Sequence, residues 1–222
     1  MGRSTATEGN DPRQVAAEVD GRVLRGERNR EAIFRALLEL IREGHPQPTA
    51  REVAERAGVQ ARTVFRHFQD MAGLNAELSE RLGAELRPLF EEATRQGSVE
   101  DRIQVLARVR GRAYERLAPF ERANRAHRQR FEFIRADHEA MVLELRKNLR
   151  GVLPELRSLP PHVHAMLELA FSFEAWDRLR TDQQLSVAQA QRAVASGALA
   201  LLRDAGTLEP RERERAKRRR SS

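Results

Sequence analysis

Residues 49–68 constrain the fold more than any other part of the chain, because they carry the start and stop signals of two short helices. Thr49 and Glu52 form the pattern of a capping box, in which both side chains bond to backbone amides at a helix start. Gly58 stands where a helix often ends with a positive φ. Val64 and Phe68, four residues apart, supply the inward face of a second helix. The stretch therefore predicts two helices joined by a tight glycine turn.

The opposite face of the second helix is expected to be exposed. Its side chains can donate to bases or phosphates, or can lie flat against a thymine methyl group. They are Gln60, Ala61, Arg62, Thr63, Arg66 and His67. This layout is typical of a helix-turn-helix, whose second helix enters the DNA major groove. The alternative is a helical hairpin buried in an ordinary all-α domain.

At these residues the sequence resembles the TetR family of bacterial transcriptional regulators, from Arg28 to Leu82. The specific part of the resemblance is Gly58-Val59 followed by Thr63-Val64-Phe65-Arg66-His67-Phe68. The resemblance implies an all-α fold, a homodimer, and release from a DNA operator by a small ligand. It also implies DNA contacts at Thr49, Gln60, Ala61, Arg62, Thr63, Phe65, Arg66 and His67.

The chain departs from the family pattern at two phosphate contacts. The family usually has Tyr where this chain has Phe65, and Lys where it has Met71. Phe65 can pack on the sugar backbone but cannot donate a hydrogen bond. The helix start after Asp70 can still offer backbone amides to a phosphate.

Apolar residues recur at helical spacing along the chain, which predicts an all-α fold with four segments. Residues 1–21 are expected to form a flexible arm, 22–73 a helix-turn-helix domain, 74–206 a ligand-binding and dimerisation domain, and 207–222 a basic disordered tail. Within the first domain, a helix is expected over Arg30–Arg42. The tail residues Arg211–Arg220 include seven basic and two acidic side chains, so five of the seven net positive charges lie there.

The body is expected to contain several helices with proline at particular positions. Pro88 should kink or end a long helix that begins near Leu74, and Pro119 should open a later one. Pro160-Pro161 opens a helix expected to run to about Arg180. Ser186 with Gln189 caps a last helix, which should stop near Gly206.

These last two helices are predicted to form a homodimer interface. Residues 188–202 are rich in alanine and include Gly197, and such small side chains allow helices to approach closely. Pairing this segment with residues 161–180 across a two-fold axis would give a four-helix interface. The alternative is an interior helix of a monomer.

A ligand pocket is expected in the body, lined by apolar and aromatic side chains with a few polar groups. The candidates are Phe90, Tyr114, Phe120, His127, Phe131, Met141, Phe171 and Trp176, with Arg130 as a further polar group. For each of them, ordinary core packing is the competing interpretation.

No enzymatic activity, cofactor or metal is expected. His164 and Glu168 share one helix face, but no third metal ligand is visible, so a surface pair is favoured. No Gly-rich phosphate loop or nucleophile elbow occurs. The chain has no cysteine, which excludes disulfides and thiolate metal sites.

The preferred hypothesis is a cytoplasmic, homodimeric repressor, released from a palindromic operator by a small apolar or amphipathic ligand. Cytoplasmic residence is expected because no secretory signal and no apolar run of about 20 residues is found. One alternative is a helical ligand-binding or enzymatic bundle that keeps the hairpin without sequence-specific DNA binding. Another is a regulator that responds to a partner protein.

Overall fold

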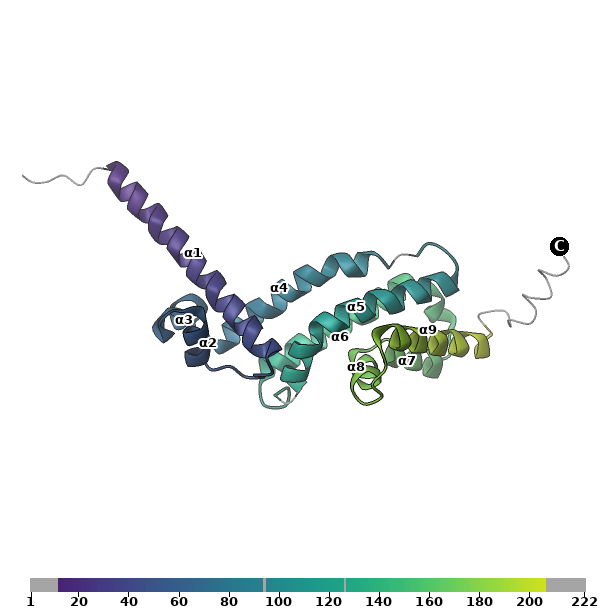
Figure 1. Cartoon of the computed structure of the whole chain (residues 1–222). Helices are drawn as coiled ribbons and strands as arrows, with labels where there is room; N and C mark the ends of the chain where they lie inside the picture. The colour runs from purple at the N-terminus through teal and green to yellow at the C-terminus, as the bar shows by residue number, and fades with distance from the viewer. Residues whose placement is uncertain (1–11, 94, 126, 207–222) are drawn as a thin grey trace, which may run out of the picture. The chain divides into compact units, whose positions relative to one another are not determined.

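The computed structural model describes residues 12–93, 95–125 and 127–206, with side chains from Val23 onward. The elements are α1 (Pro12–Arg42), α2 (Ala50–Ala57), α3 (Ala61–Phe68), α4 (Met71–Glu91), α5 (Val99–Arg125), α6 (Glu132–Val152), the 3-10 helix η1 (Pro154–Ser158), α7 (Pro161–Ala170), α8 (Phe173–Thr181) and α9 (Val187–Asp204) (Figure 1). No strand occurs in these described ranges, and the prediction of an all-α fold is confirmed.

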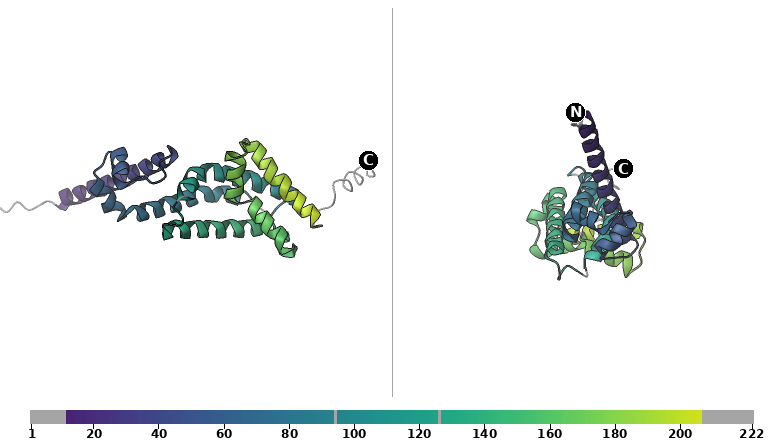
Figure 2. Two further views of the ribbon diagram at one scale, coloured as in Figure 1. Left: turned by 90° about the horizontal axis from the view of Figure 1, so that it is seen from below. Right: turned by 90° about the vertical axis from the view of Figure 1, so that its left-hand side faces the viewer.

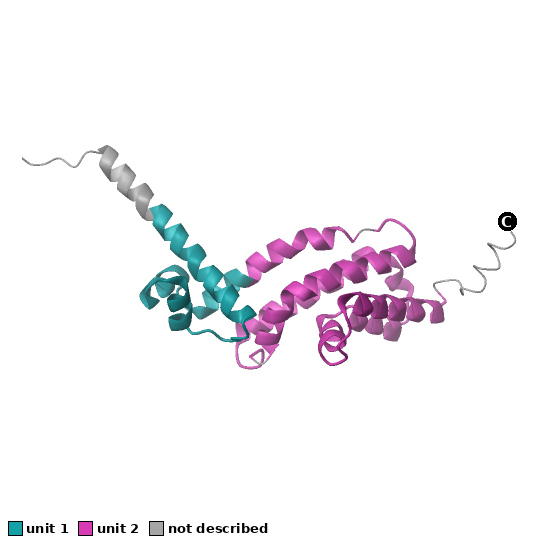
Figure 3. Ribbon diagram, viewed as in Figure 1, with its two compact units in different colours: residues 1–78 teal, residues 79–222 magenta. Residues whose placement is uncertain are grey.

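The chain divides into two compact units, residues 1–78 and 79–222 (Figure 3). Helix α4 contributes residues to both units, because the division falls between Leu78 and Ser79. The first unit holds α1, α2 and α3, and its core contains Ile33, Leu37 and Val53. Among the residues with described structure, no helix has the length and apolar character that crossing a membrane requires.

Helix α1 begins at Pro12, so the expectation of a flexible arm over residues 1–21 is wrong from Pro12 onward. Proline is tolerated in the first turn of a helix, because its missing amide would be unpaired there in any case. Between Pro12 and Arg42 only Gly21 and Gly26 disfavour a helix, and an isolated glycine is tolerated. Residues 1–11 and the predicted basic tail, residues 207–222, lie outside the described part of the chain.

Helix α5 lies at the centre of the second unit and contacts α6, α8 and α9 (Figure 2). Its fully buried side chains include Ile103, Leu106 and Tyr114. Opposite them in the same core lie Trp176 of α8 and Leu202 of α9. This core also contains many alanines, which bring α9 close to α5: the buried ones on α9 are Ala190, Ala195 and Ala198.

The single helix predicted from Pro161 to about Arg180 is wrong, because the chain breaks into α7 and α8 at Phe171 and Ser172. The Ser172 hydroxyl accepts a hydrogen bond from the Ala175 amide at 3.1 Å and caps α8. The Phe171 carbonyl accepts from the Tyr114 hydroxyl and from Arg110 Nη1, each at 2.6 Å. These buried donors from α5 stabilise the break.

The prediction that Pro119 opens a helix is also wrong, because α5 continues through it to Arg125. An internal proline removes one backbone hydrogen bond and favours a kink. Here Ala118, Phe120 and Ala123 are buried on either side of it, so tertiary packing holds the helix. Helix α4 likewise continues past Pro88 and ends at Glu91.

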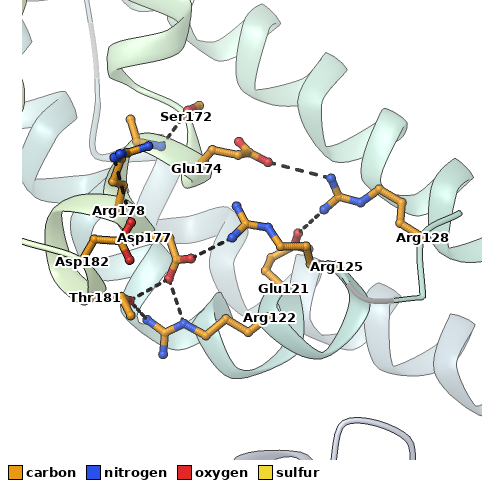
Figure 4. A network of polar contacts seen from close by, with 11 residues as sticks. Glu121, Arg122, Arg125, Arg128, Ser172, Glu174, Asp177, Arg178, Thr181 and Asp182 are labelled. Atoms are coloured by element: carbon orange, nitrogen blue, oxygen red, sulfur yellow. Dashed lines mark hydrogen bonds and ion pairs between the residues drawn. The ribbon is translucent and has the colours of Figure 1, made fainter.

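A polar network ties the end of α5 to α8 (Figure 4). The buried carboxylate of Asp177 accepts from Arg122 Nε at 2.8 Å and from Arg125 Nη1 at 3.3 Å. Arg128 lies 3.3 Å from Glu121 and 3.9 Å from Glu174. Buried carboxylates need such partners, because an unpaired charge is costly to desolvate.

Candidate nucleic-acid interface

Helix α2 begins with the predicted capping box. The Thr49 hydroxyl accepts from the Glu52 amide at 3.3 Å, and Glu52 Oε2 accepts from the Thr49 amide at 2.7 Å. The hydrogen bond from the Thr49 backbone holds the pKa of Glu52 below its usual value. The cap fixes Thr49 on the surface at the helix start.

The turn between α2 and α3 is built on Gly58, which has φ 67° and ψ 31°. This left-handed conformation is strained for residues with a Cβ atom. The Gly58 amide bonds to the Ala54 and Glu55 carbonyls, and the Val59 amide bonds to Ala54 O at 2.9 Å. These bonds end α2 and set the direction in which α3 begins.

Helix α3 presents two different faces. Val64 and Phe68 are buried inside the first unit. Arg62 and Arg66 are exposed, and neither forms an ion pair with any residue whose structure is described. The other exposed candidates are Thr49, Gln60, Ala61 and Phe65, while Thr63 and His67 are half-buried. The surface is therefore cationic, with two arginines free to meet phosphates or base edges.

His67 differs from the other predicted contacts because its ring packs within the unit. Its Nε2 atom is buried and has no hydrogen-bond partner among the described residues. A Cβ atom placed on Gly26 of α1 would lie 3.9 Å from His67 Cε1. Burial lowers the pKa of His67, and the charges of Arg66 and Arg30 lower it further. The ring thus helps to join α3 to α1.

The amides at the start of α4 are less available than the sequence suggested. Asp70 Oδ1 accepts from the Gly73 amide at 2.8 Å and occupies that donor. Nearby, Arg30 of α1 forms an ion pair with Glu77 and lies over the Phe68 ring, 5.1 Å from its centroid. This arginine serves the packing of the first unit.

The second unit contains a pocket of about 400 Å³ between α6 and the α7–α8 region. The residues that line it are Arg110, Met141, Val142, Leu145, Arg146, Leu149, Ala165, Glu168, Leu169, Ser172, Phe173 and Glu174. Its volume falls in the usual range of small-molecule sites. Of the eight residues predicted to line a ligand pocket, Met141 is the one found in this lining.

The other predicted pocket residues lie elsewhere. Tyr114, Phe120, Phe171 and Trp176 are buried. Phe90 packs against the core of the second unit from its edge. The His127 and Phe131 rings contact each other between α5 and α6, with centroids 6.2 Å apart, and Arg130 lies over Phe131.

Arg110 lines the pocket although it is only 3% exposed, and it was not among the predicted pocket residues. Its signal was present in the sequence: it follows Leu106 by four residues and precedes Ala113 by three, so it interrupts an apolar helix face. The pair expected at His164 and Glu168 forms with 3.3 Å between His164 Nε2 and Glu168 Oε1. Arg146 Nε also contacts Glu168 at 2.8 Å, which makes this an ion-pair cluster.

Comparisons with known proteins identify the first unit. Residues 30–78 match the family model described as bacterial regulatory proteins, tetR family. That range contains all of α2 and α3 with the capping box and the glycine turn. A comparison with curated proteins found no match.

Solved structures share the fold along most of the chain. A transcriptional regulator from Rhodococcus sp. Rha1 is 21% identical, with a TM-score of 0.61 over 83% of this chain and 99% of that one. A TetR-family regulator from Mesorhizobium loti is 21% identical, with a TM-score of 0.58 over 80% of this chain and 96% of that one. A further regulator, from Streptomyces coelicolor, is 20% identical, with a TM-score of 0.55 over 76% of this chain and 96% of that one.

The family match covers the helix-turn-helix, whose exposed face carries Arg62 and Arg66, and the solved structures share the fold of the body. The prediction that the chain is not an enzyme is confirmed, because the matched family is one of transcriptional regulators. The chain carries, over residues 30–78, the helix-turn-helix domain of the TetR family of bacterial regulatory proteins.

Proposed function

We propose that this regulator is a cytoplasmic homodimeric repressor that a small ligand releases from a palindromic operator. The exposed face of α3 is the observation that carries the proposal, because Arg62 and Arg66 project from a helix whose other face is locked in the core. Arginine remains charged and its planar fork matches guanine edges and phosphates.

Within this face we assign base reading to the residues at the start of α3. Arg62 reads a guanine edge, Gln60 reads a second base, and Ala61 contacts a thymine methyl group. Phosphate contacts fall to Thr49, Thr63, Arg66 and His67, while Phe65 packs on the sugar backbone. Among these, His67 has the least freedom, because its Nε2 atom is buried.

The DNA assignment is tested by changing Arg62 to alanine. We expect Arg62→Ala to cost about 1–3 kcal/mol of binding and to relax the preference at one operator position. The operator is first obtained by selection of genomic fragments on the full-length protein. Arg178→Ala, at an exposed arginine of α8, is the matched control and should leave affinity unchanged. Equal affinity of the Arg62→Ala protein and its parent would remove Arg62 from the base-reading set.

Salt dependence supplies an independent check of the phosphate contacts. Each neutralised phosphate releases counterions, so the logarithm of the association constant should fall linearly with the logarithm of the salt concentration. Arg66→Ala should weaken binding to all sequences alike and reduce the slope by about one. If the protein bound no DNA duplex even at low salt, the proposed action on an operator would be refuted.

The proposed dimer interface is formed by α7 and α9, which contact each other in the protomer. On α7, Met166 and Leu169 are 47% and 52% exposed. The exposed face of α9 consists largely of small side chains, Ala193, Ser196, Gly197 and Ala200. Such a surface allows close helix approach, and a two-fold pair would present two α3 helices to half-sites about 34–36 Å apart.

The proposed release acts through α4. This helix contributes residues to both compact units, and Leu86 and Leu89 are buried in the core of the second unit. A ligand that favours one arrangement of the body shifts the population of the whole protein toward it. Because both half-sites must be engaged in register, a small displacement of α4 is expected to weaken operator binding.

A further inference from the structure

Arg110 is a buried cation that forms no close ion pair with any residue whose structure is described. Its guanidinium donates to the Phe171 carbonyl at 2.6 Å, to the Leu145 carbonyl at 2.5 Å and to Asn148 Oδ1 at 3.4 Å. Within the described part of the chain, no carboxylate lies within 4 Å of it, and its Nε has no hydrogen-bond partner. Burying a charge is costly unless an opposite charge accompanies it.

The two acidic side chains that line the same pocket are engaged with other cations. Glu168 forms an ion pair with Arg146 Nε at 2.8 Å and lies 3.5 Å from Arg150 Nη2. Glu174 forms an ion pair with Arg128 Nη1 at 3.9 Å. Figure 4 shows these two side chains pointing toward one another. Burial lowers the pKa of Arg110, although guanidinium groups remain charged in proteins. The nearby charge of Glu168 and the Tyr114 hydroxyl favour the charged form of Arg110, but Glu168 is shared with Arg146 and Arg150 and makes no direct ion pair with Arg110.

The rest of the pocket suits an apolar body. Met141, Val142, Leu145 and Leu149 of α6 form one side, and Phe173 of α8 contributes an aromatic ring. Leu169 also lines the pocket and is half exposed, so the pocket opens to solvent. A site with apolar walls and one fixed polar anchor is typical of small-molecule pockets.

We propose that this pocket binds an amphipathic organic anion, whose carboxylate pairs with Arg110 and whose hydrocarbon part lies against α6 and Phe173. The inference rests on the proposed function, because it names the chemical class of the releasing ligand. A carboxylate would place a negative charge in direct contact with Arg110 through charge-assisted hydrogen bonds, which are stronger than neutral ones.

The test compares three probes that share one hydrocarbon chain on the full-length protein: decanoate, decanol and decyltrimethylammonium. We expect decanoate to raise the melting temperature and to bind roughly ten- to a hundredfold more tightly than decanol. Decyltrimethylammonium should bind least, because it places a second cation beside Arg110. Equal binding of decanoate and decanol would overturn the anion proposal, and so would binding of neither.

Two variants locate the site. Arg110→Met should remove the preference for decanoate over decanol, whereas Arg112→Met, at an exposed arginine of the same helix, should preserve it. Arg110→Met also removes two bonds to backbone carbonyls, so Val142→Trp provides a second route by filling the pocket while keeping Arg110. Val142→Trp should abolish decanoate binding. Unchanged decanoate affinity in the Val142→Trp protein would contradict the proposed site. If the Val142→Trp protein instead loses self-association but still binds decanoate, the pocket is occupied by a second copy of the chain.

Operator binding is measured in parallel, both without a probe and with decanoate. If the protein binds its operator and decanoate does not change that affinity, the ligand class is wrong and the DNA-binding proposal stands. If no DNA is bound while decanoate still binds at Arg110, the proposed function fails and the anion site survives.

Discussion

At the scale of single residues, the side chains of α3 in the first unit fall into two groups: those that hold the helix in place and those that face outward. Val64 and Phe68 are buried and fix the helix axis. Arg62 and Arg66, each two positions from Val64 on the same helix, are left exposed. This division is what a recognition helix requires, because reading groups must be preorganised by a rigid support.

Phe65 gives the first prediction at this scale. Its ring is 48% exposed on the same surface as the two arginines, and it has no hydrogen-bonding group. We expect Phe65→Tyr to tighten operator binding about fivefold, because a hydroxyl there can donate to a phosphate. The measurement is a titration of the operator duplex. Phe133→Tyr, a half-buried position in the body, serves as control, and weaker binding of the Phe65→Tyr protein would argue against a phosphate near this ring.

His67 gives a prediction about pH. Burial lowers its pKa below the ordinary 6.5, so the unfolded chain takes up the proton first as the pH falls. The neutral ring therefore contributes its full stability to the folded first unit above about pH 6.5. As the pH falls below that value, this contribution decreases, and the decrease ends once the pH is below the pKa of the folded state.

The measurement is thermal unfolding between about pH 8 and pH 5.5. The fall in melting temperature as the pH is lowered should be smaller in a His67→Gln protein than in the parent. His45→Gln, at an exposed histidine of the same unit, should keep the parent's slope. Identical slopes in the parent and the His67→Gln protein would show that the ring titrates as it does in the unfolded chain.

At the scale of elements, the second unit depends on close approach of α5 to its neighbours. Gly111 is buried where Trp176 of α8 crosses α5. The Trp176 indole donates to Glu115 Oε1 at 2.9 Å, and Arg180 Nε donates to the same oxygen at 2.8 Å. The hydrogen bond from Arg180 holds the pKa of Glu115 below its usual value. The tryptophan ring is therefore held in place and cannot move freely.

Gly111→Ala is predicted to destabilise the second unit by about 1–3 kcal/mol. A Cβ atom there would lie 2.6 Å from Trp176 Cη2 and 3.0 Å from Cζ3, so the ring or the helix must shift. Gly83→Ala, at an exposed position of α4 with open space around it, should instead stabilise by roughly 0.5–1 kcal/mol. Chemical denaturation measures both, and a stability of the Gly111→Ala protein no lower than the parent's would mean that the ring adapts without cost.

At the scale of the whole molecule, the proposed function depends on pairing two chains. Gly197 lies on the exposed face of α9, and a Cβ atom there meets nothing within 4 Å in the protomer. We predict that Gly197→Arg leaves the protomer folded but prevents close approach of a second copy. The protein should then be monomeric and bind the palindromic operator more weakly than the parent does. Sedimentation and operator titration measure these effects. Gly83→Arg, which also points into open space, is the control, and a persistent dimer in the Gly197→Arg protein would place the interface elsewhere.

The sequence by itself determined the features that depend on neighbouring residues. The capping box at Thr49, the turn at Gly58 and the two faces of α3 all rest on groups within four residues of one another. Hydrogen bonds and helical periodicity act over that distance, so the residue pattern alone was enough to predict the helix-turn-helix. The family was indicated by the resemblance of the motif between Gly58 and Phe68.

Tertiary structure alone decided the break between α7 and α8 and the place of the pocket. Arg110 and the Phe171 carbonyl are 61 residues apart in the chain, yet their hydrogen bond supports the break. Three of the predicted pocket residues, Tyr114, Phe171 and Trp176, are buried in the core of the second unit and do not line the pocket. Which side of α5 each group meets is set by packing between distant helices, and periodicity along one helix carries no information about its partners.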